Sequence, residues 1–253
     1  WRWKANGGSA SASGTESGNT LAYSTQVNST AGFAIVTYTG NGADDTDCTV
    51  NHALGSTPAM VIVKNRTDGS SRYQVYHQKL TSGKNILLDS TNGEDTYTSY
   101  IKAVSSSTFT VRDSDADGNL FVNKDNSNYV AYVFAEVEGF SKFGSYVGNG
   151  NADGPYVHLG FRPAFLVVKE ISANGEDWMV WDNKRATYNE VFTHLYWNTN
   201  SSEQGTAGGS TRKIDFLSNG FKTTVSHDST NTSGNTFIYM AFAKLPTKYS
   251  NAR

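Results

Sequence analysis

The chain repeats itself once along its length. A segment that reads GFAIVTYTGNG begins at Gly32, and a similar segment, GFSKFGSYVGNG, begins at Gly139, about 107 residues later. The similarity continues from HALGSTPAMVIVK, which begins at His52, to HLGFRPAFLVVK, which begins at His158. It ends with YVAYVFAEV in the first copy and FIYMAFAKL in the second. Solenoid repeats are about 20 to 50 residues long, so a period near 107 predicts two tandem copies of one globular domain.

The composition between these landmarks predicts strands and turns. The chain has 253 residues, of which 24 are glycine and 13% are aromatic, and runs of β-branched and aromatic residues alternate with Gly, Ser, Thr and Asn. No window of about eleven residues shows a period of 3.6, so helices should be short or absent. We therefore expect an all-β protein with two tandem antiparallel β-sandwich domains of the jelly-roll kind.

The expected strands are short and separated by turn-forming residues. In the first copy we expect strands over 33–39, 60–65, 73–78, 84–89, 98–103, 108–112 and 129–137. In the second copy we expect them over 142–147, 155–158, 165–171, 178–183, 193–197, 213–217, 220–225 and 236–244. The first repeated segment ends in the triplet GNG in both copies, and the residues of this triplet tolerate a positive φ.

Three segments follow from the repeat. Residues 1–31 are rich in Gly, Ser, Thr and Asn, and we expect them to form an extended leader or linker. We expect residues 32–138 to form the first domain and residues 139–253 to form the second. Trp1 and Trp3 alternate about Arg2 as in a strand, and we expect them to pack against a neighbouring domain or subunit. The absence of an initiating Met and of a signal-peptide pattern predicts that Trp1 is an internal point of a longer protein.

Charge and hydropathy argue against two classes of partner. The net charge is −2, from 21 basic and 23 acidic residues without a long run of either sign, so we expect no nucleic-acid surface. No apolar stretch approaches about 18 residues, so we expect no membrane insertion. Cys48 is the only cysteine, which excludes an intrachain disulfide, and we expect it to be a small buried side chain rather than a nucleophile.

One acidic string resembles half of a calcium loop. Asp113, Asp115 and Asp117 alternate in DSDADG, as carboxylates do that converge on a hard cation. The position expected to hold a bidentate glutamate is Lys124, and no helix pattern flanks the loop. Two interpretations remain open, a weak calcium site and a solvated hairpin loop, and the sequence indicates no other cofactor.

No pattern in the chain indicates catalysis. The sequence lacks a GxSxG elbow, an HExxH helix and a phosphate-binding glycine loop ahead of a helix. His52 and His158 occupy related places in the two copies but lack a second ligand nearby, which favours packing or hydrogen bonding over metal binding. We therefore expect that the chain is not an enzyme.

Aromatic residues supply the candidates for ligand binding. Those that recur at the same place in both copies are expected to belong to the domain core. These repeated pairs are Tyr73 with Tyr76 and Trp178 with Trp181. Unrepeated aromatics among polar residues are better surface candidates, because a ring beside polar groups suits sugar stacking. They are Tyr188, Tyr196 and Trp197.

The repeated strings also carry a family resemblance. Residues 32–253, above all the strings over 139–169 and the terminal YSNAR, resemble a domain of unknown function in virion proteins of marine tailed bacteriophages. Those proteins are tail-fibre-like and carry concanavalin A-like or laminin G-like jelly-roll domains. In such proteins KYSNAR is similar to the natural C-terminus, and WRWKANGG resembles the segment that leads out of a preceding β domain. The family offers no catalytic residues to transfer.

The resemblance implies a location rather than a chemistry. It implies a protein of the virion, in the tail or an appendage and extracellular when mature, which contacts other virion proteins and forms a homotrimer. The expected task is adhesion to a glycan or protein of the host surface through loops. Two alternatives stay open: a purely structural component, such as a capsid decoration or tail spacer, and a polysaccharide depolymerase, which requires two carboxylates converging in a groove.

Overall fold

The computed structural model of the chain describes residues 3–5, 10–114, 122–205 and 212–244. The chain forms two compact units. Unit 1 comprises Trp1–Leu88 and Asp95–Glu136, and unit 2 comprises Asp89–Glu94 and Val137–Arg253.

Both units consist of short strands, and all pairs of named strands are antiparallel. The strands of unit 1 are β1 (Ala12–Gly14), β2 (Tyr23–Asn28), β3 (Phe33–Thr39), β4 (Asp47–Asn51), β5 (Met60–Asn65), β6 (Gln74–His77), β7 (Ile86–Leu87), β8 (Tyr100–Val104), β9 (Thr108–Arg112) and β10 (Asn128–Phe134). Those of unit 2 are β11 (Ser141–Val147), β12 (Tyr156–His158), β13 (Pro163–Glu170), β14 (Met179–Asp182), β15 (His194–Tyr196), β16 (Ile214–Leu217), β17 (Gly220–Thr223) and β18 (Thr236–Ala243). The described helices are the 3-10 turn η1 (Ser29–Ala31) and the single-turn α1 (Asp228–Asn231), and neither has the length to cross a membrane.

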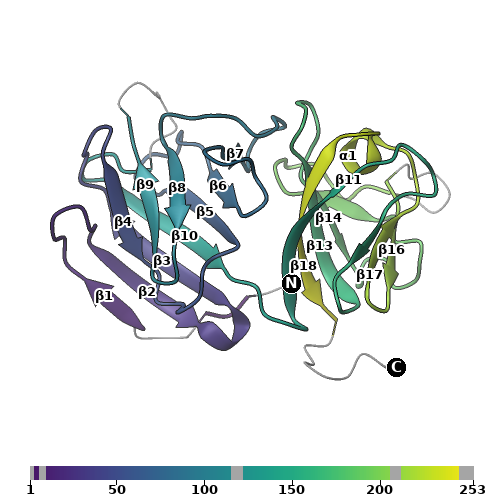
Figure 1. The fold of residues 1–253 in the computed structure, drawn as a ribbon, viewed down its shortest axis with the longest axis horizontal. Coiled ribbons are helices and arrows are strands. Elements are labelled where there is room, and N and C mark those ends of the chain that lie inside the picture. Colours follow the sequence, from purple (N-terminus) through teal and green to yellow (C-terminus); the bar gives the residue numbers. More distant parts are fainter. Residues whose placement is uncertain (1–2, 6–9, 115–121, 206–211, 245–253) are drawn as a thin grey trace. The chain divides into compact units, whose positions relative to one another are not determined.

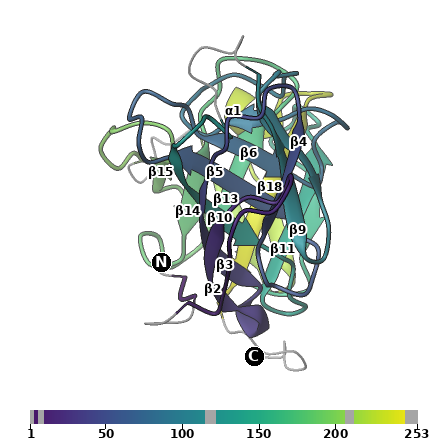
Figure 2. The same ribbon diagram turned by 90° about the vertical axis from the view of Figure 1, so that its left-hand side faces the viewer.

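Each unit is a sandwich of one larger and one smaller sheet (Figures 1 and 2). In unit 1 the sheet β1-β2-β3-β10-β5-β6-β7 packs on the sheet β4-β9-β8. In unit 2 the sheet β11-β18-β13-β14-β15 packs on the sheet β12-β17-β16. Apart from β1 and β2, the two units therefore have the same strand order, as the internal repeat predicts.

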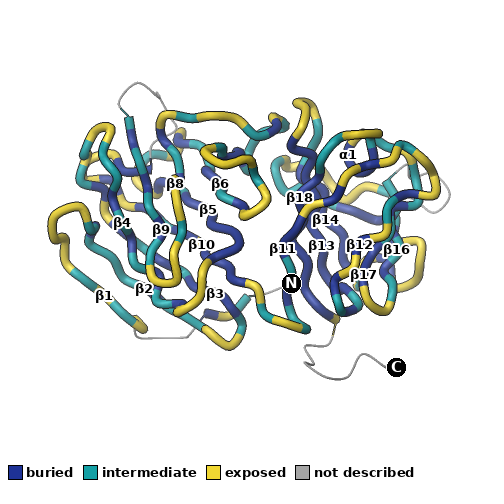
Figure 3. The backbone as a smooth tube through the Cα atoms, viewed as in Figure 1, coloured by how far each residue is buried: buried dark blue, intermediate teal, exposed yellow. Residues whose placement is uncertain are grey.

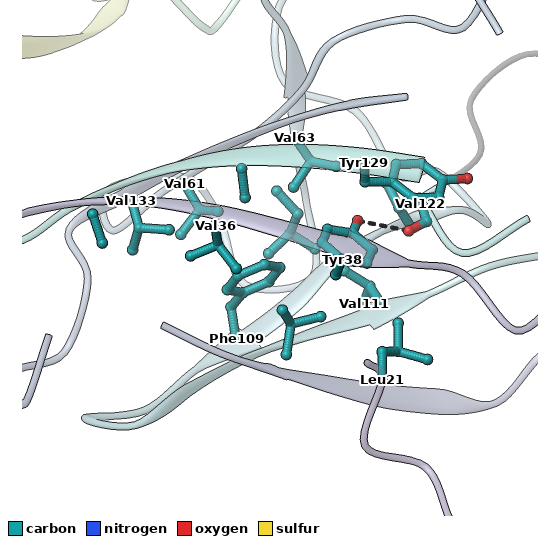
Figure 4. Packing of buried hydrophobic residues seen from close by; sticks show 14 of the residues in the cluster. Leu21, Val36, Tyr38, Val61, Val63, Phe109, Val111, Val122, Tyr129 and Val133 are labelled. Carbon is teal, nitrogen blue, oxygen red and sulfur yellow. Dashed lines mark hydrogen bonds between the residues drawn. The ribbon is translucent and has the colours of Figure 1, made fainter. Parts of the chain in front are cut away.

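The core of unit 1 lies between its two sheets, along strands that contain many buried residues (Figure 3), and side chains of facing strands meet there (Figure 4). The Tyr38 and Tyr129 rings, from β3 and β10, stack with centroids 4.8 Å apart and an angle of 9° between their planes. Phe109 of β9 meets the edge of Tyr38 at 6.0 Å. Aromatic burial of this kind supplies much of the hydrophobic stabilisation of a small domain.

The core of unit 2 repeats this arrangement with different residues. Tyr146 and Phe237, from β11 and β18, stack at 5.1 Å and 13°, in the places that Tyr38 and Tyr129 hold in unit 1. Phe221 of the smaller sheet meets the edge of Tyr146 at 5.8 Å. Trp181 of β14 is fully buried in the same cluster. The two units therefore have separate hydrophobic cores built on one plan.

A pair of asparagines, one of which is fully buried, stands beside each aromatic stack, and we call this pair the asparagine corner. In unit 1, Asn123 accepts a hydrogen bond from the backbone N–H of Asn41 (3.1 Å) and donates to the Asn41 side-chain oxygen (2.9 Å). In unit 2, Asn231 makes the same two bonds with Asn149, at 2.8 and 3.1 Å. Both Asn123 and Asn231 are fully buried, so these bonds satisfy groups that would otherwise be costly to desolvate.

The tyrosine of each stack is fixed to the same region. The Tyr38 hydroxyl donates to the Val122 carbonyl at 2.7 Å (Figure 4), and the Tyr146 hydroxyl donates to the Thr230 carbonyl at 2.7 Å. Burial raises the pKa of both tyrosines well above its ordinary value, so both hydroxyls stay protonated and remain donors. Each sandwich therefore has one polar cluster, which joins β3 to the segment before β10 in unit 1 and β11 to the segment before β18 in unit 2.

The glycines of the GNG triplets are required by this geometry. Gly42 and Gly150 have φ values of 67° and 68°, as the sequence predicts for these turns. Gly148 lies so close to Thr232 that a Cβ atom would collide with the Thr232 carbonyl oxygen. Glycine is therefore needed both for backbone conformation and for close approach.

The all-β sandwich prediction is confirmed, and most strand positions agree with the sequence analysis. The ranges predicted over 33–39, 60–65 and 108–112 coincide with β3, β5 and β9. The range predicted over 84–89 contains only β7, which is two residues long. β4 was not among the predicted strands, because its sequence DCTVN contains only two apolar residues.

The expectation for residues 1–31 differs from the structure. Within this segment β1 pairs with β2, β2 pairs with β3, and Leu21 is fully buried in the unit 1 core. Trp3 packs on Phe33 and Phe134, with centroids 6.4 and 5.6 Å away. A polar strand at a sheet edge needs only backbone pairing and a few inward side chains, so its composition resembles that of a linker. Trp1 lies outside the described residues.

A second difference concerns residues 89–94, which were expected in the first domain but belong to unit 2. The backbone N–H of Glu94 donates to the Ile171 carbonyl at 3.0 Å, and that of Gly175 donates to the Thr91 carbonyl at 2.9 Å. The side chain of Asn174 accepts from the Gly93 N–H at 2.8 Å. Backbone hydrogen bonds leave no hydrophobic pattern, so the sequence could not assign this loop to the second unit.

We predict that Asn231→Ala lowers the free energy of unfolding by about 3 kcal/mol, because it removes the four hydrogen bonds that the fully buried side chain of Asn231 makes with its partners. These partners are the Asn149 N–H and side-chain oxygen and the carbonyls of Asn151 and Val225. Urea unfolding followed by tryptophan fluorescence measures the change. The control is Asn200→Ala at an exposed loop position, which we expect to be neutral. Equal effects of the two substitutions would contradict a structural role for the corner.

Candidate functional site

Tyr188 is the predicted ligand-binding residue that lies in a surface cavity. Its side chain is 84% exposed, the highest value among the exposed large hydrophobic residues of the described chain. The cavity has a volume of about 380 Å³ and lies in unit 2 between the segment 185–192, which joins β14 to β15, and Lys213, which precedes β16. An aromatic ring that projects beside a cavity is available for stacking.

The charged groups of this cavity are paired with one another or with residues close by. Lys213 forms an ion pair with Glu190 at 2.9 Å, and Arg185 forms ion pairs with Asp182 and with Glu203, the latter at 2.6 Å. The hydrogen bond from Lys213 lowers the pKa of the Glu190 carboxyl, which therefore stays ionised near neutral pH. The cavity is consequently polar but locally balanced in charge, and this favours an uncharged polar ligand over an ionic one.

The sequence analysis identified Tyr188 but missed the charged residues around it. Arg185, Glu190 and Lys213 were not among the candidates. Arg185 and Glu190 flank Tyr188 within the string KRATYNE, so their proximity was readable from the chain. Lys213 comes close only because β16 lies in the facing sheet, which no local pattern predicts.

Tyr196 and Trp197 do not line this cavity. Tyr196 is half-buried at the end of β15, packs against the unit 2 core, and has the Arg212 guanidinium 5.9 Å from its ring centroid. Trp197 is also half-buried and meets Trp178 edge to face at 6.4 Å. Tyr188 therefore lies apart from the other two candidates. Those two rings contact Arg212 and Trp178 instead of the cavity.

The repeated aromatics are divided between the core and a surface. Trp178 and Trp181 are buried, as predicted for residues that belong to the domain plan. Tyr73 is half-buried beneath the Lys64 ammonium group, which lies 4.8 Å from its ring centroid. Tyr76 is half-buried and lines a cavity of unit 1 as well as packing against the core. The same position of the repeat is thus interior in unit 2 and partly accessible in unit 1.

Asp113 has a structural partner in the described chain. Its side chain is buried, and a carboxylate oxygen accepts a hydrogen bond from the Val122 N–H at 3.1 Å. Asp115 and Asp117 lie outside the described residues, so the calcium hypothesis stays a prediction. Within the described ranges, no three His, Cys, Asp or Glu residues gather in a way that could hold a metal ion.

The two related histidines differ in their surroundings. His52 is fully buried; its Nδ1 accepts from the Leu54 N–H at 3.1 Å, and its Nε2 lies 3.2 Å from the Ser105 carbonyl. His158 is exposed, with Nδ1 3.2 Å from the Tyr156 hydroxyl.

Cys48 is buried beside Asn123, and burial raises the pKa of its thiol, so it is not activated as a nucleophile.

Strongly displaced pKa values often mark functional sites, and Lys169 of β13 is one such group. Burial lowers the pKa of its ammonium group to about 8. Nearby carboxylates such as Glu170 raise this pKa, but their effect is smaller than that of burial. However, its Nζ donates to the carbonyls of Thr91 (3.2 Å) and Glu176 (2.8 Å), and its side chain is fully buried. Lys169 therefore holds two loops of unit 2 together and is inaccessible to a ligand.

We predict that unit 2 becomes more stable as pH rises from about 8 to about 10.5. The pKa of Lys169 is lower in the folded state than in the unfolded chain, so between these values the unfolded state binds more protons and folding is favoured at higher pH. The gain is on the order of 3 kcal/mol. Urea unfolding across this range should show the rise in wild type and in the exposed control Lys79→Met, but not in Lys169→Met. If the free energy of unfolding of all three proteins changed with pH in the same way, Lys169 would not be the source of the rise.

Comparison with known proteins gives a family but no function. No curated protein and no solved structure matches this chain. The model of one protein family matches residues 1–246, which include both sandwich units up to the end of β18. The chain therefore belongs to the family described as a domain of unknown function, DUF7483.

Proposed function

We propose that this chain is an adhesion module of a bacteriophage virion, located in the tail or an appendage, and that it binds a host surface glycan. In this proposal it assembles with other virion proteins as a homotrimer and is extracellular in the mature particle. The resemblance of residues 32–253 to tail-fibre-like proteins supports the location. The observation that carries the binding function is the exposed Tyr188 ring beside a polar cavity of unit 2.

The chemistry of the cavity supports a glycan as the ligand. A sugar ring presents an apolar face, which can stack on an exposed tyrosine, and hydroxyl groups, which need both donors and acceptors. Close to Tyr188, Glu190 supplies acceptors and Lys213 supplies donors. The ion pair between Glu190 and Lys213 holds these two side chains in place before a ligand arrives, which reduces the entropy lost on binding.

Binding without hydrolysis is also supported by the composition of this cavity. Glycoside cleavage generally uses two carboxylates about 5 to 9 Å apart. Among the described residues that line the cavity, Glu190 is the only carboxylate, and its lowered pKa is unsuited to a general acid. A depolymerase would need a different arrangement from the one at Tyr188.

We predict that Tyr188→Ala weakens glycan binding about fivefold, because the stacking ring contributes on the order of 1 kcal/mol. Tyr188→Phe should retain most of the affinity, since the ring rather than the hydroxyl makes the contact. The matched control is Tyr156→Ala, which removes another exposed tyrosine of unit 2 outside the cavity. A glycan array with the intact chain identifies the sugar, and isothermal titration calorimetry measures the affinities.

Two results would contradict this proposal. Equal binding by wild type and Tyr188→Ala would exclude the cavity as the site. Failure of the intact chain to bind any glycan on the array would favour the purely structural alternative, in which both units contact only other virion proteins.

A further inference from the structure

Three polar residues lie side by side at one end of the large sheet of unit 1. Asn128 of β10 is paired with Thr39 of β3, and Arg66, which directly follows β5, donates its backbone N–H to the Asn128 carbonyl at 2.7 Å. Successive side chains of a strand point to opposite faces, and the neighbours of these residues along β3 and β10 belong to the core. The three side chains therefore lie on the outward face of the sheet.

These residues line a cavity with a volume of about 270 Å³. Ser24 of β2 and Thr37 of β3, which are paired with each other, line it too. We call the five residues the polar row. Arg66, Asn128 and Thr39 are exposed, and Ser24 and Thr37 are half-buried, so a small ligand can reach all of them.

Arg66 is the only charged residue among the described residues that line this cavity. It forms no ion pair with any residue that the structure describes. Asp68, two residues further on, accepts hydrogen bonds from the Ser70 N–H and hydroxyl at 2.9 and 2.6 Å. These bonds lower the pKa of the Asp68 carboxyl most, and Lys124 and Lys64 contribute less. The Arg66 guanidinium is therefore available to an acidic ligand.

The other side chains of the polar row have hydrogen-bonding groups to spare. The Thr39 hydroxyl donates to the Asn128 side-chain oxygen and the Thr37 hydroxyl donates to the Ser24 carbonyl, both at 3.4 Å. Both threonine oxygens can still accept a hydrogen bond. Within the described chain, the Asn128 side-chain NH2 and the Ser24 hydroxyl have no hydrogen-bond partner. The row therefore offers both donors and acceptors beside the guanidinium.

The shared sandwich does not require these residues. In unit 2 the Ile171 N–H donates to the Thr236 carbonyl at 3.0 Å, as Arg66 does to Asn128, and Thr236 is paired with Val147. Two of the three equivalent positions are thus apolar in unit 2. A guanidinium at this place is consequently a property of unit 1 and not of the common frame.

We propose that the polar row is a second binding site, and that it binds an acidic sugar whose carboxylate pairs with the Arg66 guanidinium. A guanidinium presents parallel N–H donors that match the two oxygens of a carboxylate. Asn128 and the hydroxyls of the row would bond to the hydroxyl groups of the sugar. The volume is at the small end for ligand pockets, which suits a single sugar ring. The site depends on unit 1 alone, so it stands whether or not the Tyr188 cavity binds a glycan.

The experiment titrates the intact 15N-labelled chain with small probes and follows backbone amide shifts by NMR. The probes are methyl glucuronide, which carries a carboxylate, methyl glucoside, which is its uncharged counterpart, and acetate, which is a carboxylate without a sugar. We expect methyl glucuronide to shift amides of residues 22–24, 37–39, 66 and 128–129. It should bind at least about tenfold more tightly than either other probe, and higher salt should weaken its binding.

Three variants test the role of Arg66. Arg66→Gln should weaken binding of methyl glucuronide about tenfold, and Arg66→Lys, which keeps the charge but loses the paired donors, about threefold. Lys79→Gln removes an exposed lysine of unit 1 that does not line the cavity, and it should have no effect. Because Arg66 is exposed, amides away from the cavity should keep their wild-type shifts in both Arg66 variants.

Four results would overturn the proposal. They are the absence of methyl glucuronide binding, equal affinity for methyl glucoside, equal affinity for acetate, and an equal effect of Lys79→Gln and Arg66→Gln.

Discussion

The asparagine corner is the interaction on which each sandwich depends. Asn123 in unit 1 and Asn231 in unit 2 are fully buried, and each bonds to the asparagine of a GNG turn 82 residues before it. The pair joins the end of β3 or β11 to the segment before β10 or β18, next to the stacked aromatic rings. A buried amide has a fixed set of donors and acceptors, so it specifies one closure of the sandwich where apolar packing alone would allow several.

The shared frame leaves the loops free to diverge. The segment between β6 and β7 and the segment between β14 and β15 differ in sequence and in length, yet both lie over a cavity at the same place. In unit 2 the loop carries the exposed Tyr188 among paired charges, whereas the loop of unit 1 has a different lining. The duplicated frame therefore fixes the core and leaves the chemistry of these loops to vary between the two units.

The sequence predicted the fold class and most strands, because period-two patterns and turn residues are local signals. It did not predict β1 and β2, whose polar residues resemble a linker, nor the membership of residues 89–94 in unit 2, which rests on backbone bonds. Tyr188 was identified because it is unrepeated and flanked by polar residues. Lys213 could not be placed beside its cavity, because its position depends on the pairing of the two sheets. The repeated spacing from each GNG turn to Asn123 or Asn231 was a signal that could have revealed the corner.

Each unit has its own asparagine corner beside its own core, and hydrogen exchange measured by mass spectrometry on the intact Asn123→Ala variant can check this independence. We expect amides of β3, β5 and β10 to lose protection, while those of β11, β13 and β18 exchange as in wild type. A uniform loss of protection in both units, or no change in either, would contradict it.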